Sequence, residues 1–409
     1  MNEIQLDMYQ TAGVGVLALL LGMFLTRKIP FLKRFCIPAA VSGGIIFSLI
    51  ALAMYSWGHV ELSFDGTLKD ICMMLFFTSV GFQSNLKVLK QGGRPLLVMI
   101  VLVAVMIVVQ NGLAVGIASA LGLEPIIGMA AGSIPMSGGH GTAGGFSPLL
   151  ESMGVTGAAS ISMAAATFGL VAGSLLGGPL AQRLIQKHDL SSKSDDSQDT
   201  MISVEANTAS PESQVPHLHS EEDDFRRFSR AVYQMLIALA AGAVLSKLLS
   251  LTGITFPTYF GTLMVAAIMR NIYETVPNAP SLEIERIVSL GNVCLSLFLG
   301  MAMISLRFWE LADLALPLIT MLLAQVVFLG LFAYFVAFRA LGKDYDAAVL
   351  VSGFCGFGLG ATPNAMANMS AVCFKYQYTV KPFIIVPIMG AMFADIINTT
   401  VITLFLNIL

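Results

Sequence analysis

Long stretches without charged side chains alternate with short charged segments along most of this chain. Besides two glycine-rich stretches, six of them reach the roughly 20 residues that a helix needs to cross the apolar core of a bilayer. These stretches are residues 35–58, 95–123, 152–182, 248–269, 287–306 and 314–338. The pattern predicts an all-α polytopic membrane protein.

The first half of the chain predicts five membrane helices separated by short polar segments. Their expected ranges are residues 11–26, 37–55, 70–83, 95–121 and 158–180, with a polar loop at 59–69. Between residues 185 and 229, Ser, Asp, Glu and His dominate, and such a segment buries too little apolar surface to fold by itself. We therefore expect a first repeat at 1–184, a hydrophilic linker at 185–229 and a second repeat at 230–409.

Two glycine-rich stretches, about 125–150 and 347–374, are apolar enough for a membrane but unsuited to a continuous helix. They contain the runs Ser137-Gly-Gly-His-Gly-Thr142 and Gly356-Phe-Gly-Leu-Gly-Ala-Thr-Pro363. Glycine costs about 1 kcal/mol and proline about 3 kcal/mol in a helix interior. Broken backbone at membrane depth is tolerated where it is buried in protein or lines a wet cavity. We predict one re-entrant hairpin from each stretch, because matching breaks in two halves are typical of a transporter's binding site.

The two halves also match residue by residue at a nearly constant offset. Gly138 precedes Gly358 by 220 positions, and other pairs follow in the same order along the chain. These pairs are Gly22 with Gly242, Cys72 with Cys294, Pro95 with Pro317 and Leu121 with Leu341. Collinear matches over a whole half indicate an internal duplication.

The placement of basic residues decides between two topologies. If each hairpin were a full crossing, each half would cross the membrane six times and the two repeats would have the same orientation. If each half crosses five times, the second repeat is inverted relative to the first. Cytoplasmic segments of membrane proteins carry an excess of Lys and Arg. With five crossings and an outside N-terminus, all of the 22 Lys and Arg residues fall inside except Lys69, Lys247 and Arg307. We therefore expect two inverted repeats of five helices, both termini outside and a cytoplasmic linker.

Composition agrees with this class and excludes several others. Apolar residues make up 56% of the chain and charged residues 11%, against roughly 45–50% and 25% in soluble domains. The N-terminus lacks the basic segment of a cleaved signal, so the first helix is expected to be retained. The five cysteines form no CxxC pair, and no GxxxxGK[ST] run indicates ATP binding. No Ser-His-Asp set or metal-ligand spacing is present, so we expect neither an enzyme nor a nucleic-acid partner.

Four motifs make the chain similar to a known family. They are the two hairpin runs, the run Gly291-Asn-Val-Cys-Leu-Ser-Leu-Phe-Leu299 and the run Tyr345-Asp-Ala-Ala-Val-Leu350. The chain resembles the bacterial sodium/glutamate symporter family over nearly its whole length, apart from the linker. The resemblance implies sodium-coupled import of L-glutamate across the inner membrane by an elevator-type homodimer. Asn364 stands where the family pattern has Thr.

Glutamate binding sets the chemistry that we look for in the hairpins. Exposed backbone N–H groups at half-helix starts suit carboxylates, because they combine donors with the positive end of the helix dipole. Ser137, Thr142 and Thr362 add hydroxyl donors, and glycines let a ligand approach the backbone. The expected substrate-binding residues are Ser137, Gly138, Gly139, His140, Gly141, Thr142, Gly358, Gly360, Thr362, Asn364 and Asp395. The glycines have an alternative role in close helix packing, and His140 has one in fixing the hairpin.

Sodium prefers hard oxygen ligands. The sodium candidates are Asn292, Asn368, Asp395 and Asn398, polar residues inside apolar stretches. The two asparagines Asn292 and Asn368 have the alternative of bridging helices. Asp395 is the only charged side chain after Lys381, and an intramembrane acid is a functional-site hypothesis by default.

Two other functions stay open at this stage. One is symport of another small organic anion, such as aspartate or a dicarboxylate, coupled to sodium or protons. The other is an ion channel lined by the two hairpins. A channel would conduct far faster than a carrier and would not concentrate its substrate.

Overall fold

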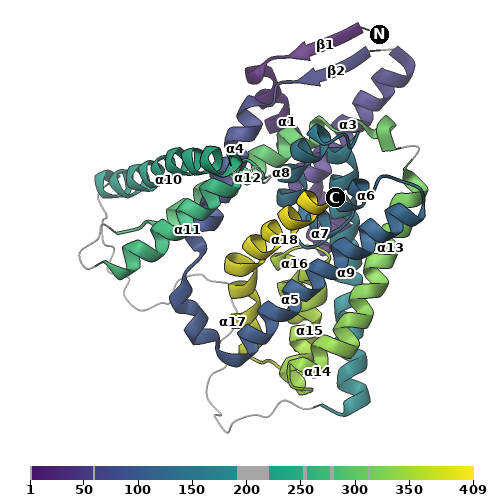
Figure 1. The fold of residues 1–409 in the computed structure, drawn as a ribbon, viewed down its shortest axis with the longest axis vertical. Coiled ribbons are helices and arrows are strands. Elements are labelled where there is room, and N and C mark those ends of the chain that lie inside the picture. The colour runs from purple at the N-terminus through teal and green to yellow at the C-terminus, as the bar shows by residue number, and fades with distance from the viewer. Residues whose placement is uncertain (1, 59, 191–220, 252–255, 277–280, 312–313) are drawn as a thin grey trace.

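The computed structural model describes residues 2–58, 60–190, 221–251, 256–276, 281–311 and 314–409, and these residues are predominantly helical (Figure 1). The elements of the first half are β1 (Asn2–Leu6), α1 (Met8–Lys28), α2 (Pro30–Arg34), α3 (Ala39–Gly58), β2 (Val60–Phe64), α4 (Thr67–Gln83), α5 (Leu86–Ala120), α6 (Pro125–Met129), α7 (Ser133–Met136), α8 (Gly139–Ser152) and α9 (Ala158–His188).

The second half begins after the linker. Its elements are α10 (Glu221–Ser250), α11 (Phe260–Thr275), α12 (Ile284–Ile304), the 3-10 turn η1 (Phe308–Leu311), α13 (Ala315–Phe332), the π-helical η2 (Ala333–Ala337), α14 (Phe338–Ala340), α15 (Tyr345–Gly358), α16 (Thr362–Lys375), α17 (Lys381–Ile388), the π-helical η3 (Met389–Ala394) and α18 (Asp395–Ile408).

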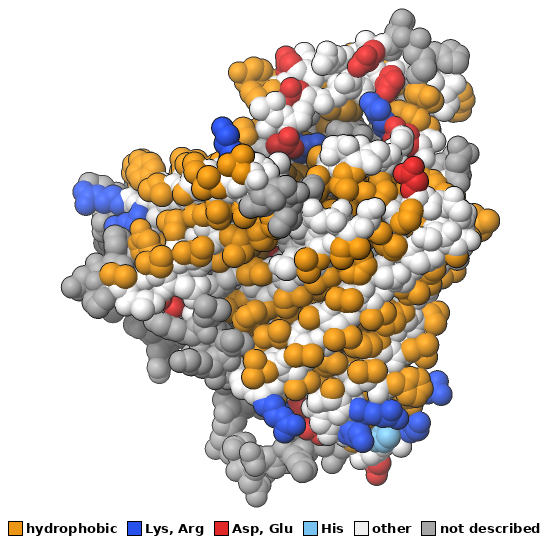
Figure 2. Space-filling view, viewed as in Figure 1, with side chains coloured by type: hydrophobic (Ala, Val, Ile, Leu, Met, Phe, Trp, Pro, Cys, Tyr) orange, Lys and Arg blue, Asp and Glu red, His pale blue; other side chains and the backbone are white. Residues whose placement is uncertain are grey.

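The helices confirm the prediction of a polytopic α-helical membrane protein. Among the described residues, eight helical segments are long and apolar enough to cross a bilayer. The other two expected crossings correspond to α4 and α11, which have 17 and 16 residues. Hydrophobic side chains cover most of the middle of the visible surface, whereas Lys and Arg side chains gather at the lower end, below α14 (Figure 2).

The N-terminal segment and the expected loop at 59–69 differ from the prediction. β1 and β2 pair in parallel, with Asn2 opposite Val60 and Leu6 opposite Phe64. Helix α1 begins three residues earlier than expected because Asp7 caps it. The Asp7 Oδ1 atom accepts the Gln10 backbone N–H at 2.8 Å, and Gln10 Oε1 accepts the Asp7 N–H at 3.1 Å. This reciprocal pair is a capping box.

Helical structure extends into both ends of the expected linker. Helix α9 continues to His188, and α10 already begins at Glu221. Extending an existing helix costs much less free energy than nucleating a new one, so the two apolar helices continue into polar residues of the linker. Linker residues 191–220 lie outside the described residues.

Two groups of helices make up the molecule (Figure 1). The first, which we call the six-helix group, contains α1, α3, α4, α10, α11 and α12, and its members pack on one another. The second, the hairpin group, contains the elements α5 to α9 and α13 to α18. Helix α12 contacts α8, and α4 contacts η3, where the groups meet.

Helices α4 and α12, which pack closely together, run in opposite directions. Arg307 follows α12 and Glu61 precedes α4, and their side chains form an ion pair at 3.1 Å. Near the same end, Tyr55 stacks on Trp309 with ring centroids 4.1 Å apart. The start of α4 and the end of α12 therefore lie at one end of the molecule.

Candidate functional site

A cavity of about 480 Å³ lies between the two helix groups. Its walls come from both glycine-rich stretches, from α4 and α12, and from the junction of η3 and α18. Cavities of roughly 300–1,000 Å³ are typical of small-molecule sites. Most of the residues expected from the sequence line it: Ser137, Gly138, Gly139, His140, Gly141, Thr142, Gly360, Thr362, Asn364, Asn292 and Asp395.

The first glycine-rich stretch brings the start of α8 to this cavity. The chain turns at Ser137 and Gly138, and Gly139 has φ of +61°, a conformation that glycine adopts without strain. No side chain caps the helix at Gly138. The first N–H groups of a helix have no partner within it. The cavity therefore faces a helix start with free donors and the positive end of a dipole.

The second stretch brings the start of α16 to the same cavity. Helix α15 ends at Gly358, and α16 begins at Thr362 after Ala361, again without a side-chain cap. The Asn364 side chain is buried and donates from Nδ2 to the Leu170 carbonyl at 2.8 Å. Its Oδ1 atom is buried without a hydrogen-bond partner among the described residues. Asn364 thus supplies a free acceptor at this helix start.

His140 is held by a threonine of the hairpin group. Its Nε2 atom lies 3.0 Å from Thr167 Oγ1. The Thr167 hydroxyl donates its single proton to the Met163 carbonyl at 2.9 Å. The imidazole must therefore donate from Nε2–H, which leaves Nδ1 as the acceptor of the neutral ring.

Asp395 lines the cavity where the π-helical η3 gives way to α18. Such π-helical turns are frequent at functional sites. Among the described residues that line the cavity, Asp395 is the one carboxylate, and none is Lys or Arg. An anion in this cavity therefore has no fixed cationic side chain to pair with.

The six-helix group supplies a mostly apolar wall. The wall side chains are Phe76, Phe77, Val80 and Gln83 from α4, and Asn292, Leu295 and Leu299 from α12. Tyr259 stacks on Phe77 at 3.6 Å between ring centroids and is fully buried behind it. Polar groups of the cavity therefore come chiefly from the hairpin group.

Three residues expected at the site lie away from the cavity. At Gly358, an added Cβ would stand 2.6 Å from Met106 Sδ, so this glycine allows close helix packing. Asn368 donates to the carbonyls of Gly173 at 3.0 Å and Ser352 at 3.3 Å. Asn398 accepts the Ser133 hydroxyl at 2.7 Å and bridges α18 to α7. These contacts support the bridging alternative for Asn368.

Sequence reasoning missed Gln110 of α5, which is fully buried. Its Nε2 atom donates to the Gly358 carbonyl at 2.8 Å, and its Oε1 atom accepts the Ser137 hydroxyl at 2.6 Å. Ser137 was expected to offer its hydroxyl proton to the ligand, and this contact uses that proton. The sequence did contain a signal for Gln110, because it is a polar residue in the middle of the uncharged stretch 95–123.

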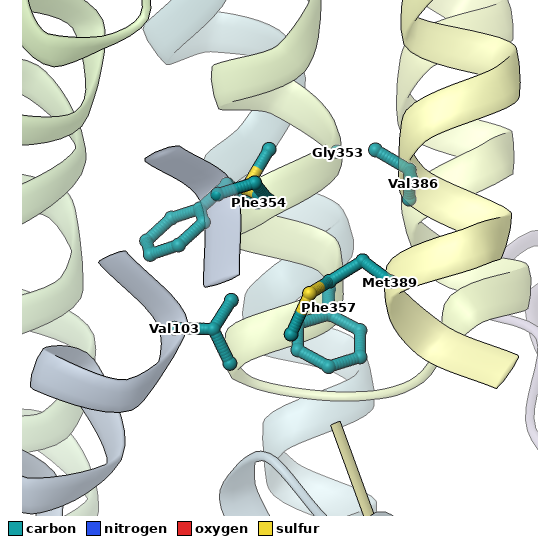
Figure 3. A pocket seen from close by; sticks show the side chains of 7 residues that line it. Val103, Gly353, Phe354, Phe357, Val386 and Met389 are labelled. Carbon is teal, nitrogen blue, oxygen red and sulfur yellow. The ribbon is translucent and has the colours of Figure 1, made fainter. Parts of the chain in front are cut away.

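A second, much smaller cavity of about 10 Å³ borders the second glycine-rich stretch (Figure 3). Its lining is apolar and comes from Met99, Val103, Gly353, Phe354, Phe357, Val386 and Met389. A water molecule needs about this much room and also polar hydrogen-bond partners, and the apolar side chains of this lining are not such partners. Phe357 lines both the small cavity and the large one.

Comparison with known proteins identifies the family to which the chain belongs. The sequence profile of the family described as "Sodium/glutamate symporter" matches residues 4–378. The chain is 40% identical over 413 residues to the sodium/glutamate symporter of Escherichia coli (strain K12), covering 98% of each chain. It is 38% identical over 393 residues to that of Haemophilus influenzae, covering 95% of each. This 409-residue chain belongs to the sodium/glutamate symporter family.

Proposed function

We propose that this protein is a sodium-coupled symporter that imports L-glutamate across a bacterial inner membrane by alternating access. The relatives at 38–40% identity are named sodium/glutamate symporters. The observation that carries the proposal is the meeting of two uncapped helix starts, those of α8 and α16, in one cavity.

The two helix starts match the two carboxylates of glutamate. Each start offers free backbone donors and a positive dipole end, which stabilise an anion. At α16, Pro363 lacks an N–H, and the hydroxyl of Thr362, which lines the cavity, can supply a further donor. The ammonium group of glutamate needs acceptors, and two lining residues carry them: Asp395, and Asn364 with its buried, unpartnered Oδ1. Asp395, Asn364 and the helix starts together are the substrate groups of the proposal.

Sodium supplies the charge that the cavity lacks. Glutamate carries one net negative charge, and Asp395 adds another, while the described lining contains no Lys or Arg. Bringing both anions together without a cation is costly in a low-dielectric site. A bound sodium ion, with Asp395 among its oxygen ligands, removes this cost and couples the two solutes. Asn292 is a second candidate ligand because it lines the cavity from α12.

The fold supports two inverted repeats, residues 1–184 and 230–409. Cys72 of α4 and Cys294 of α12 are separated by 222 positions, and their side chains contact each other. Equivalent residues meet in this way beside a two-fold axis. Because α4 and α12 run in opposite directions, that axis relates repeats of opposite orientation in the membrane. A close helix crossing at Gly22 and Gly43 also has a counterpart at Gly242 and Gly261.

Short helices in the glycine-rich stretches support two re-entrant hairpins. Helices α8, α15 and α16 have 14 residues each. At 1.5 Å per residue, such a helix spans about 21 Å, less than the hydrocarbon thickness of about 30 Å. Each stretch would therefore enter the membrane and return on the same side. With five crossings per repeat, both termini lie outside and the linker lies in the cytoplasm.

An elevator movement fits the two helix groups. The wall contributed by α4 and α12 is mostly apolar, and the polar groups of the cavity belong chiefly to the hairpin group. The hairpin group would therefore slide past the six-helix group without breaking many hydrogen bonds. A homodimer, as the family resemblance implies, would hold the six-helix groups fixed.

Uptake by purified protein in proteoliposomes tests the proposed function. An inward sodium gradient should drive saturable accumulation of labelled L-glutamate, and dissipating the gradient should abolish it. Competition by unlabelled aspartate and by dicarboxylates separates glutamate from other small anions. Sodium-independent uptake, absent uptake by folded protein, or currents far above carrier rates would each contradict the proposal.

A further inference from the structure

Gln110 connects the two glycine-rich stretches through one side chain. It lies on α5, between the first stretch at Ser137 and the second at Gly358. Its backbone carbonyl accepts the Gln325 side chain of α13 at 2.8 Å. Gln110, Ser137 and Gln325 are all buried. The turn of each stretch is therefore fixed to the same point of the hairpin group.

The direction of each hydrogen bond among Gln110, Gly358 and Ser137 is fixed by the chemistry of the groups. A carbonyl oxygen only accepts, so the Gln110 amide must present its NH₂ group to Gly358. Its oxygen then faces Ser137, and the Ser137 hydroxyl must donate to it. The other neighbour of that hydroxyl is the Gly358 carbonyl at 3.5 Å, which is also an acceptor. Ser137 thus has no proton left for a ligand.

Ser137 nevertheless lines the large cavity. With its proton directed to Gln110, its oxygen presents lone pairs and acts as an acceptor. Acceptors suit a cation, and an acceptor-only oxygen is unfavourable next to a carboxylate. The orientation of the Gln110 amide therefore determines whether the Ser137 hydroxyl can bind a cation or an anion.

We propose that Gln110 is a positioning residue of the transport site, which ties the two hairpins together and sets Ser137 as an oxygen ligand for a cation. The cation is either the sodium ion or the ammonium group of the substrate. This inference rests on the proposed function, and it adds a residue outside the cavity and a role for Ser137.

The test uses Gln110→Met, Ser137→Ala and the double variant in the full-length protein. Methionine has a similar length and shape to glutamine but makes neither hydrogen bond. Sodium- and glutamate-induced thermal stabilisation of purified protein is measured together with uptake. We expect the half-saturating concentration of sodium or of glutamate to rise about tenfold or more in each single variant, as for loss of a hydrogen bond to a charged group. The double variant should behave as the single ones do, because both remove the same contact.

Gln234 provides a matched control. It is a buried glutamine of α10, which donates to the Ser281 carbonyl at 3.0 Å and accepts the Glu283 N–H at 3.3 Å, away from the cavity. Gln234→Met should leave both half-saturating concentrations unaltered. Unaltered constants in Gln110→Met, or independent and additive effects of Gln110→Met and Ser137→Ala, would overturn the proposal.

Competition by glutarate, which has both carboxylates but no ammonium, distinguishes the two cations. If Ser137 binds sodium, the Ser137→Ala variant loses affinity for glutamate and glutarate equally. If Ser137 binds the ammonium, only glutamate binding weakens. If Gln110→Met fails to fold, the Ser137→Ala variant provides the test, because it keeps the Gln110 bond to Gly358. Unaltered half-saturating concentrations of sodium and glutamate in Ser137→Ala would then overturn the proposal. Absence of uptake by the unmodified protein would instead contradict the proposed function.

Discussion

The carbonyl oxygen of Gly360 lies 3.1 Å from the position that a Cβ atom of Gly139 would occupy. These two residues belong to different halves of the chain, and they bring the turns of the two glycine-rich stretches into contact. A side chain at Gly139 would crowd this carbonyl and press on the other turn. The cavity therefore depends on both halves at one point.

Substitution of Gly139 by alanine should impair uptake strongly. Its φ of +61° costs an alanine about 1–2 kcal/mol, and the new methyl group would crowd Gly360. We expect an inserted protein whose initial rate of glutamate uptake falls at least about fivefold. Gly178→Ala on α9 is the control, since nothing lies within 4 Å of its added Cβ. Equal uptake by the two variants would show that the contact at Gly139 tolerates bulk.

Asp395→Asn should nearly abolish uptake. The substitution keeps size and hydrogen bonding but removes the one carboxylate among the described residues of the cavity lining. Sodium titrations separate the partners: a sodium ligand shifts the sodium dependence, and an ammonium partner weakens glutamate binding at saturating sodium. Asp346→Asn is the control, because Asp346 pairs with Lys381 at 3.8 Å at the start of α15, where a partly exposed pair contributes little. An Asp395→Asn protein with normal sodium and glutamate dependence would exclude a role for this charge.

Asn364 and Asn368 lie one helical turn apart on α16 and should behave differently. Asn364→Ala removes the buried, unpartnered Oδ1 acceptor of a residue that lines the cavity. We expect a raised half-saturating concentration for glutamate or sodium. Asn368→Ala removes two carbonyl contacts outside the cavity, so about 1–3 kcal/mol of stability should be lost with both constants retained. Uptake kinetics and thermal unfolding of both variants provide the measurement, and the opposite pattern would reverse the two assignments.

The topology predicts which side of the membrane the linker occupies. A cysteine placed at Ser203 should react with a membrane-impermeant thiol reagent in inverted vesicles and not in intact cells. The unmodified protein, with its five native cysteines, gives the background. Labelling of intact cells above that background would contradict five crossings in each repeat.

The sequence by itself determined the class of protein and the location of the two breaks. A membrane helix requires about 20 consecutive apolar residues, and this is a local property that is visible in the sequence itself. Glycine and proline in the runs at Gly138 and Gly358 act on their own backbone, so their effect needs no knowledge of neighbours. The lone charge of Asp395 was visible in the same way. Family resemblance then supplied glutamate and sodium.

Tertiary structure alone decided which polar residues share the cavity. Asn364 and Asn368 have similar sequence surroundings, but only Asn364 lines it, because the packing of α16 against α9 determines which side of the helix is covered. The pairing of β1 with β2 joins segments that carry no mutual signal along the chain. The role of Ser137 depends on a bond from Gln110, and Gln110 is oriented by Gly358, 248 positions further on. Hydrogen-bond direction at such a site follows from long-range contacts, which no local pattern of residues specifies.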